Sequence, residues 1–291
     1  ANINLGQYAN QQPTAASQNI GSMRGIPAPI TLQAFDPDQD ILSRSLVSAP
    51  TSGTLHESLL FYPTGGFYPD GCIGPGQCNK VYDFEVSGDQ KFAYVANGNG
   101  GLTVIDLEVT SPDPKILLAS LDTNGLARSV TLSSDERTLY LGDGTLGLKI
   151  INVSDPLNPI LMSTIAIGDS AYDVALSDNQ RYVFVAHLTG LSRVDVSDPY
   201  NPEVLATVIT PGDAQSIALS SNNNEAYVGD GFKGFQVIDI SQPTTLKILN
   251  GLDTDGEVFS VALSPDNSTL YVADGNFGFC LLYTSPSPRD S

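Results

Sequence analysis

The stretch Ser129-Val-Thr-Leu-Ser-Ser-Asp-Glu-Arg-Thr-Leu-Tyr-Leu-Gly142 contains the pattern that decides the fold. Within it, Ser133, Asp135 and Tyr140 form a marker of the type Ser-x-Asp/Asn-x-x-x-x-Tyr/Phe. The marker occurs five times, with its serine at Ser87, Ser133, Ser177, Ser220 and Ser264. Successive serines are separated by 46, 44, 43 and 44 residues, so the chain contains an internal repeat of about 44 residues.

A second marker follows each of the first four copies and keeps the same period. It is Gly-Leu-Thr-Val-Ile-Asp-Leu from Gly101, and its other copies begin at Gly147, Gly190 and Gly234. Two independent markers with one period are poorly explained by chance. The repeat is therefore a structural unit.

Each repeat predicts four antiparallel strands. Alternation with a period of two predicts a first strand at 129–133, and a polar turn leads to a second strand at 138–142. A glycine-rich turn precedes a third strand rich in Val and Ile, and a Ser-Asp-Pro-x-Asn-Pro turn precedes a fourth strand at Ile160–Ile165. Four-stranded units of ~40–45 residues are typical of β-propeller blades, which bury their faces by stacking radially. We expect an all-β fold with four complete blades and a partial fifth, preceded by a small β-sandwich-like module.

These residues carry a family resemblance. The unit Gly-Leu-x-Val-Ile-Asp-Val-Ser-x-Pro, preceded by Tyr-Val-Ala-Asp-Gly, resembles the LVIVD repeat of bacterial and archaeal surface propellers, over about Val81 to Phe279. Two departures are Arg193, where other repeats have Val or Ile, and His187-Leu188, where others have Asp-Gly. The resemblance implies surface binding or adhesion and supplies no catalytic residues.

The segments outside the repeats have different compositions. Residues 13–70 resemble a partial cadherin-like or Ig-like module of bacterial adhesins, on the stretches Ile30–Leu55 and Leu60–Phe67 within a match of about Pro13 to Tyr68. We expect residues 1–12 to be a linker or the end of a preceding module, residues 71–80 to be a linker, and residues 81–279 to be the propeller.

The C-terminal segment, 280–291, breaks the repeat in chemistry. Cys280 to Asp290 resembles one reading frame of a transposon-end adapter used for sequencing libraries, so we expect an adapter-derived artefact. Its first residues are apolar and compatible with a strand. They predict a third strand in the fifth blade that Pro286 ends, with no fourth strand.

Acidic residues dominate the charge, with 32 Asp and Glu against 13 Lys and Arg and a net charge of −19. Such a charge repels nucleic-acid phosphates and anionic lipids, so both are poor partners and we expect no nucleic-acid binding. No stretch approaches the ~20 apolar residues of a membrane span. The chain starts at Ala1 without Met and stops within a repeat, so we expect a fragment of an extracellular or cell-surface protein. An acidic surface that keeps such a protein soluble explains the charge without any ligand.

Two cysteines lie in the expected linker, in Cys72-Ile-Gly-Pro-Gly-Gln-Cys78. The Gly- and Pro-rich segment between them can bend back and close a small disulfide loop, which an oxidising compartment supports. Two free thiols in a linker are the alternative. No His or further Cys lies nearby to complete a tetrahedral zinc site.

One acidic turn is a candidate calcium site. Asp36, Asp38 and Asp40 in Asp-Pro-Asp-Gln-Asp can converge on one hard cation, since Ca²⁺ takes 6–8 oxygen ligands. The stretch is not an EF-hand, because Val47 occupies the position of the bidentate Glu. The cadherin-like resemblance implies calcium at Asp36 and Asp38, and a polar turn at a strand end is the alternative.

Acidic turn residues repeat along the propeller. In a blade with an inner first strand, the turns between the second and third strands lie on the same rim as the loops that join consecutive blades. We expect these two sets to form one acidic binding rim for cations, a basic partner, or a protein or glycan ligand. The turns carry Asn97, Asp143, His187, Asp230 and Asp274, and the loops carry Asp122, Asp169, Asp213 and Asp253. Ordinary Asp-Gly hairpin chemistry explains the Asp positions one at a time.

The sequence contains no recognisable catalytic motif. Its only histidines are His56 and His187, and it has neither a Gly-x-Ser-x-Gly elbow nor a His-Glu-x-x-His motif. We therefore expect a noncatalytic binding or adhesion scaffold, with calcium as the one expected cofactor. The alternative is a lactonase-like propeller hydrolase with a channel metal held by the turn residues Asn97, Asp143, His187, Asp230 and Asp274.

Overall fold

The computed structural model describes residues 80–107 and 117–283, together with the backbone of four short strands ahead of them. The chain divides into two compact units, Ala1–Gly66 and Phe67–Ser291. In the first unit, β1 (Ile3–Leu5) pairs antiparallel with β4 (Arg44–Leu46), and β2 (Thr14–Ala15) pairs with β3 (Ala34–Phe35).

Several sequence predictions fall outside the described residues. The candidate calcium ligands and the candidate disulfide both do, and they stay predictions: Asp36, Asp38, Asp40, Cys72 and Cys78.

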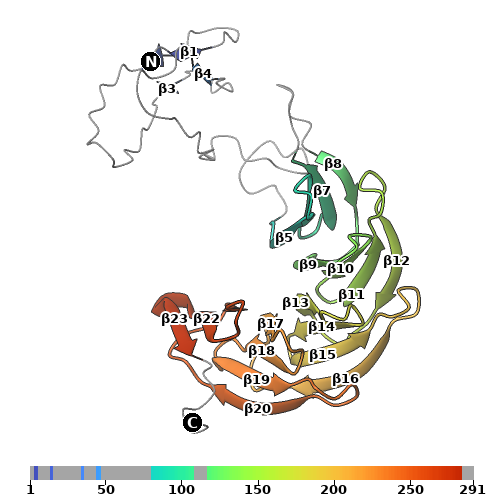
Figure 1. Cartoon of the computed structure of the whole chain (residues 1–291), viewed down its shortest axis with the longest axis vertical. Helices are drawn as coiled ribbons and strands as arrows, with labels where there is room; N and C mark the ends of the chain where they lie inside the picture. Colours follow the sequence, from blue (N-terminus) through green and yellow to red (C-terminus); the bar gives the residue numbers. More distant parts are fainter. Residues whose placement is uncertain are drawn as a thin grey trace. The chain divides into compact units, whose positions relative to one another are not determined.

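The second unit consists of five antiparallel sheets, each from one repeat (Figure 1). Blade 1 contains β5 (Asp83–Val86), β6 (Phe92–Ala96), β7 (Leu102–Asp106) and β8 (Leu117–Leu121). Blade 2 contains β9 (Ser129–Leu132), β10 (Thr138–Gly142), β11 (Leu148–Asn152) and β12 (Ile160–Ile165). Blade 3 contains β13 (Ala171–Leu176), β14 (Tyr182–His187), β15 (Gly190–Asp195) and β16 (Glu203–Ile209).

Blade 4 contains β17 (Ser216–Leu219), β18 (Glu225–Gly229), β19 (Phe235–Asp239) and β20 (Lys247–Leu252). Blade 5 has three strands in the described part of the chain, β21 (Ser260–Leu263), β22 (Thr269–Ala273) and β23 (Phe279–Tyr283), with a short 3₁₀ turn, η1 (Gly275–Phe277). The predicted all-β blade architecture is confirmed. Among the described residues, no helix has the length and apolar character that crossing a membrane requires.

The first strands of consecutive blades lie side by side along the inner edge of the unit. Contacts join β5 to β9, β9 to β13, β13 to β17, and β17 to β21, and Figure 1 shows these strands along the concave side of an arc of blades. Because every blade starts on this inner edge, equivalent residues from different repeats face one central space.

The apolar core lies between blades rather than within one sheet. One buried cluster joins Tyr94 and Leu102 of blade 1 to Leu139 and Leu141 of blade 2. Three further clusters repeat this arrangement at the next three junctions. The aromatic residue of the sequence marker, such as Tyr94 at 2% exposed, packs against the following blade. A single sheet cannot bury both faces, so each blade depends on its neighbours.

The serine of the marker closes the turn after each inner strand. Ser133 directly follows β9, its Oγ donates to Asp135 Oδ1 (2.6 Å), and it accepts from the backbone N–H of Thr138 (3.0 Å). The same two bonds recur at the other four marker serines, Ser87, Ser177, Ser220 and Ser264. The prediction that these serines occupy equivalent inner-strand ends is confirmed.

The same turn also connects neighbouring blades, through an interaction that we call the turn clasp. The residue three positions after the serine has a positive φ, and its side chain accepts a hydrogen bond from the turn of the preceding blade. Gln180 accepts from the backbone N–H of Ser134 (2.8 Å), and Asn223 accepts from that of Asp178 (3.2 Å). Glu136 to Gly88 and Asn267 to Ser221 complete the series. In blade 5 the donor position is Pro265, which has no amide hydrogen.

The third strand of blade 5 was expected from the C-terminal segment, and β23 confirms it from Phe279 to Tyr283. Its register pairs Cys280 with Val272. The prediction that Pro286 ends the strand concerns a residue outside the described ones.

Candidate ligand-binding cavity

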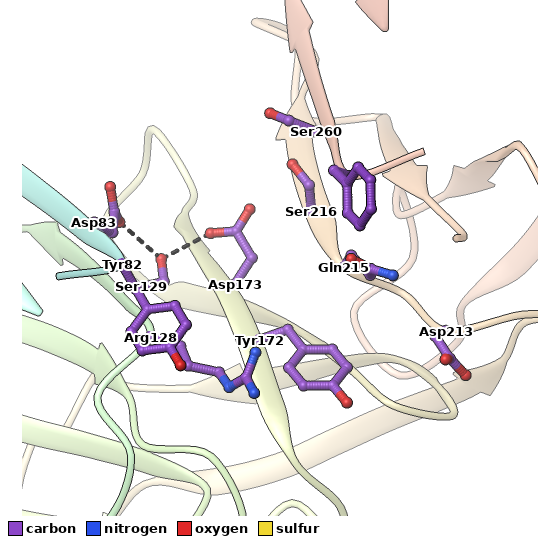
Figure 2. A pocket seen from close by; sticks show the side chains of 11 residues that line it. Tyr82, Asp83, Arg128, Ser129, Tyr172, Asp173, Asp213, Gln215, Ser216 and Ser260 are labelled. Carbon is purple, nitrogen blue, oxygen red and sulfur yellow. Dashed lines mark hydrogen bonds between the residues drawn. The ribbon is translucent and has the colours of Figure 1, made fainter. Parts of the chain in front are cut away.

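A cavity of about 430 Å³ opens at the inner edge of the five blades (Figure 2). Each blade contributes two consecutive residues at the start of its first strand, and Asp213 joins them from the loop before blade 4. The outer row is Tyr82, Arg128, Tyr172, Gln215 and Phe259, and the inner row is Asp83, Ser129, Asp173, Ser216 and Ser260. The strand pairing confirms that they are equivalent, because each inner-row residue lies opposite the end of the second strand of its blade.

The inner row connects the blades by hydrogen bonds. Each side chain accepts from a backbone N–H one residue further along in the next blade: Asp83 from Val130 (3.0 Å) and Asp173 from Ile217 (2.9 Å). Ser129 accepts likewise from Val174 (3.3 Å), and Ser216 from Val261 (3.2 Å). These polar residues therefore hold the four junctions at the floor of the cavity.

Ser129 is the centre of this row. Its Oγ lies 2.7 Å from Asp173 Oδ1 and 3.1 Å from Asp83 Oδ2, so one hydroxyl lies between two carboxylates (Figure 2). Burial raises the pKa of Asp173, and the hydrogen bonds from Ser129 and from the Ile217 N–H oppose that shift. The floor of the cavity thus contains a desolvated carboxylate whose donors are two backbone N–H groups and the hydroxyl of Ser129.

Arg128 lies between two tyrosine rings in the outer row. Its guanidinium carbon is 4.6 Å from the ring centroid of Tyr172 and 5.2 Å from that of Tyr82. Its Nε is buried and has no hydrogen-bond partner. Stacking on aromatic faces fixes the guanidinium plane, and its two terminal nitrogens, which are not among the buried atoms, remain for a ligand.

The structure places the predicted rim residues in two different environments. The five turn residues are at most 2% exposed, so they are buried parts of the blades rather than a binding surface: Asn97, Asp143, His187, Asp230 and Asp274. Of the loop residues, Asp122, Asp213 and Asp253 are exposed and Asp169 is half-buried. Asp213 alone among the nine lines the cavity.

The buried turn residues hold the loop that leads into their own blade. Thr123 Oγ1 donates to Asp143 (2.7 Å), the Gly212 N–H donates to Asp230 (3.0 Å), and Thr254 Oγ1 donates to Asp274 (2.6 Å). Burial raises the pKa of Asp143 and of Asp230, and burial lowers the pKa of His187. The loop contacts explain why the repeat keeps a polar residue at this position.

Four of the five buried turn residues also have a partner at the second or third residue of the third strand. Asn97 donates to Thr103 (3.2 Å), Lys149 lies 3.6 Å from Asp143, and Gln236 donates to Asp230 (3.2 Å). In blade 3, His187 pairs with Ser192 (3.0 Å). The two positions change together from blade to blade, which is expected of contacting buried polar groups.

The junction between blades 3 and 4 differs from the others. In three blades the glycine of the turn bridges to the strand entry of the next blade, at Gly98–Ala127, Gly144–Ala171 and Gly231–Val258. His187-Leu188-Thr189-Gly190 is one residue shorter than the corresponding turns. Arg193, 2% exposed, instead donates to the backbone carbonyls of Ile240 and Gln242 in blade 4 and stacks on Tyr182 and Phe184. The two departures from the repeat thus fall at one junction.

Within the described residues, no three His, Cys, Asp or Glu side chains come together as metal ligands. The turn residues considered as channel-metal ligands belong to separate blades. Each forms hydrogen bonds within its own blade or with the loop that leads into it. Sequence reasoning missed every cavity residue except Asp213. The available signal was a position that varies in type, Tyr, Arg, Tyr, Gln and Phe, at the start of first strands that otherwise repeat closely.

Comparisons with known proteins agree with this architecture. The chain is similar to a protein of unknown function from Desulfotomaculum acetoxidans DSM 771, at 18% identity and a TM-score of 0.57, over 71% of this chain and 69% of that one. It is also similar to the periplasmic gluconolactonase PpgL of Pseudomonas aeruginosa, at 17% identity and a TM-score of 0.58, over 71% and 69%. At these identities the likeness concerns the fold alone. No curated protein matches the sequence.

The LVIVD repeat model matches residues 80–113, 124–166, 168–210 and 211–254. These matches leave the cadherin-like resemblance of residues 13–70 and the adapter resemblance of residues 280–291 without support. They cover more than half of the chain and coincide with blades 1 to 4. The chain therefore belongs to the LVIVD repeat family.

Proposed function

We propose that the propeller unit is a noncatalytic binding scaffold, exposed outside the cell or at its surface, whose cavity binds a protein or glycan ligand. One observation carries the proposal: all five blades contribute equivalent side chains to one cavity, and these side chains differ in type while the surrounding repeat is kept. The contacts between blades are maintained, whereas the residue type varies at one position that faces the cavity. Such a scaffold is suited to recognition of a ligand. Loops and strand ends that vary on a constant framework are common binding positions.

The second candidate function is a lactonase-like hydrolase, which the similarity to the gluconolactonase favours. Its proposed metal ligands are Asn97, Asp143, His187, Asp230 and Asp274, which are buried and bonded within individual blades. The geometry of the described residues therefore favours binding over hydrolysis. Calcium support from Asp36, Asp38 and Asp40 remains part of the proposal for the N-terminal unit.

The test is binding of the whole chain to glycan and peptide arrays, with Tyr172→Ala compared with the unchanged protein. Tyr172 lines the cavity, whereas Tyr200 is 63% exposed on the turn before β16, so Tyr200→Ala is the matched control. We expect Tyr172→Ala to lose array signals that Tyr200→Ala retains. Hydrolysis of gluconolactone by the unchanged chain, or signals that ignore Tyr172→Ala, would contradict the proposal.

A further inference from the structure

We propose that the cavity recognises an acidic saccharide, a hydroxyl-rich ring that carries a carboxylate, with Arg128 as the carboxylate-binding residue. This inference rests on the proposed function, since it specifies the ligand of the same cavity. Arg128 is a cation with aromatic neighbours and no anionic partner in the part of the chain that is described.

The guanidinium of Arg128 forms no ion pair and no hydrogen bond with the part of the chain that the structure describes. In a protein of net charge −19, a cation in a cavity that also contains carboxylates would ordinarily be paired. Among the described residues, it makes cation–π contacts with the rings of Tyr82 and Tyr172. A planar carboxylate matches the N–H fork of a fixed guanidinium through two parallel hydrogen bonds.

The neighbouring carboxylates of the cavity do not take this role, because they serve the blade junctions. Asp83 accepts from the N–H groups of Phe84 and Val130, and from Ser129. Asp173 accepts from the N–H groups of Val174 and Ile217, and from Ser129. Figure 2 shows this row on one side of the cavity and Arg128 between the tyrosines on the other. The free donors of Arg128 therefore remain available for an anion from outside the chain.

The other lining groups match a sugar ring. Tyr172 and Phe259 provide aromatic rings for its C–H surfaces. The side-chain nitrogen of Gln215 donates to Glu257 (3.0 Å), which leaves the oxygen of Gln215 as an acceptor for a ligand hydroxyl. Asp213 and Ser260 add polar groups at the exposed edge. A hydroxyl-rich ligand satisfies such acceptors, whereas a purely apolar acid would leave them unpaired.

The charge around the cavity favours a single carboxylate over a phosphate or sulfate ester cluster. Three acidic residues, Asp83, Asp173 and Asp213, line the same cavity as the one cation. Each additional negative charge on the ligand interacts unfavourably with them at close range. This charge distribution favours a ligand that places one carboxylate next to Arg128 and neutral hydroxyls next to the acidic residues.

The test is isothermal titration of the whole chain with three probes that carry at most one charge: galacturonic acid, its methyl ester, and neutral galactose. We expect the acid to bind at least tenfold more tightly than its methyl ester, which has the same shape without the charge. Arg128→Gln should abolish this preference. Arg128→Lys retains the charge without the fork and should bind the acid with intermediate affinity.

Arg137→Gln is the control, because Arg137 is exposed on the turn before β10 and should leave all affinities unchanged. Thermal melts of each variant separate loss of folding from loss of binding. Three outcomes would overturn the inference and leave the proposed function standing. The acid and its ester could bind equally, or a sulfated galactose probe could bind more tightly than the acid. The third outcome is that no uronate binds, although other ligands bind in a way that depends on Tyr172. If no ligand depends on Tyr172, the proposed function itself fails.

Discussion

The side-chain oxygen of Gln180 accepts a hydrogen bond from the backbone N–H of Ser134, 2.8 Å away in the preceding blade. Gln180 has a φ of 60°, a conformation that residues other than glycine seldom adopt. The strained turn is what directs its side chain across the junction. Four junctions repeat this contact with Glu, Gln or Asn, so the geometry rather than the residue type is maintained.

Removal of the turn clasp at Gln180 should destabilise the propeller slightly. We expect Gln180→Ala to lower the free energy of unfolding by about 0.5–1 kcal/mol, because water can partly replace the bond at an exposed turn. Gln180→Asn should lie near the unchanged protein, since Asn223 and Asn267 make the same contact. Gln90→Ala is the control for the backbone conformation, with a φ of 61° and no cross-blade bond among the described residues. Urea denaturation measures all three, and equal losses for Gln90→Ala and Gln180→Ala would contradict the assignment.

Loss of the hydroxyl at Ser129 should have a larger effect. Ser129→Ala removes the donor to Asp173 and the acceptor of the Val174 N–H, so a desolvated carboxylate loses a partner at the junction of three blades. We expect a decrease of about 1–3 kcal/mol in the free energy of unfolding. Ser260 occupies the equivalent position in blade 5 and is exposed, so Ser260→Ala should change the value by much less. A Ser129→Ala variant as stable as Ser260→Ala would argue against the bridging role.

The carboxyl of Asp230 should make stability fall as pH rises. Burial raises the pKa of Asp230 above its usual 3.8, so the folded chain retains a proton that the unfolded chain has released. The contribution of this group is therefore greatest below pH 3.8 and is lost as pH rises through the raised pKa. Asp230→Asn places in blade 4 the residue type of Asn97 in blade 1. The melting temperature of this variant minus that of the unchanged protein should be larger at pH 7 than at pH 3.5. A difference in melting temperature that does not vary with pH would refute this.

Replacement of Arg193 by the residue of the other blades should weaken the junction between blades 3 and 4. Arg193→Val leaves the carbonyls of Ile240 and Gln242 without these donors, although it also removes a desolvated cation. We expect a net loss of about 1–3 kcal/mol of unfolding free energy and faster hydrogen exchange in the turn after β19. Arg181→Val provides the comparison, because Arg181 is exposed and solvent screens its 3.0 Å ion pair with Asp195, so we expect a much smaller loss. Similar losses for both variants would count against the junction role.

Much of the fold could be predicted because its determinants are local and repeated. The strands at Thr138–Gly142 and Ile160–Ile165 coincide with their predicted bounds, since Ser133, the glycine turns and Pro159 set the strand ends within a few residues. The turn residue Asp143 illustrates the limit of this reasoning. Asp-Gly in a hairpin suggests an exposed turn, but Thr123 from the loop before β9 covers the carboxylate. Such a contact joins residues of two repeats and has no local sequence signal.

The cavity could not be predicted in the same way, because its residues share a position and not a chemistry. Tyr82, Arg128 and Tyr172 come from three blades, and only the radial stacking brings the guanidinium between the two rings. Comparison of the repeats identifies the residues that stay constant, whereas the cavity is lined at a position where the residue type varies. Alignment of the repeats by Ser133 and its equivalents would have exposed this variable position, but not the contacts that give it a chemical meaning.

Pro265 leaves the fifth blade without the backbone N–H that donates in the turn clasp. The four preceding blades offer an N–H at this position, and each is tied through it to the blade that follows. A neighbour packed on this face of blade 5 would form no turn clasp there, because a proline has no amide hydrogen. It would be held by one restraint fewer than the neighbours of blades 1 to 4. In a stack whose members are stabilised by nearest neighbours, opening begins where the coupling is weakest. Such a neighbour would therefore be the first to separate from the stack.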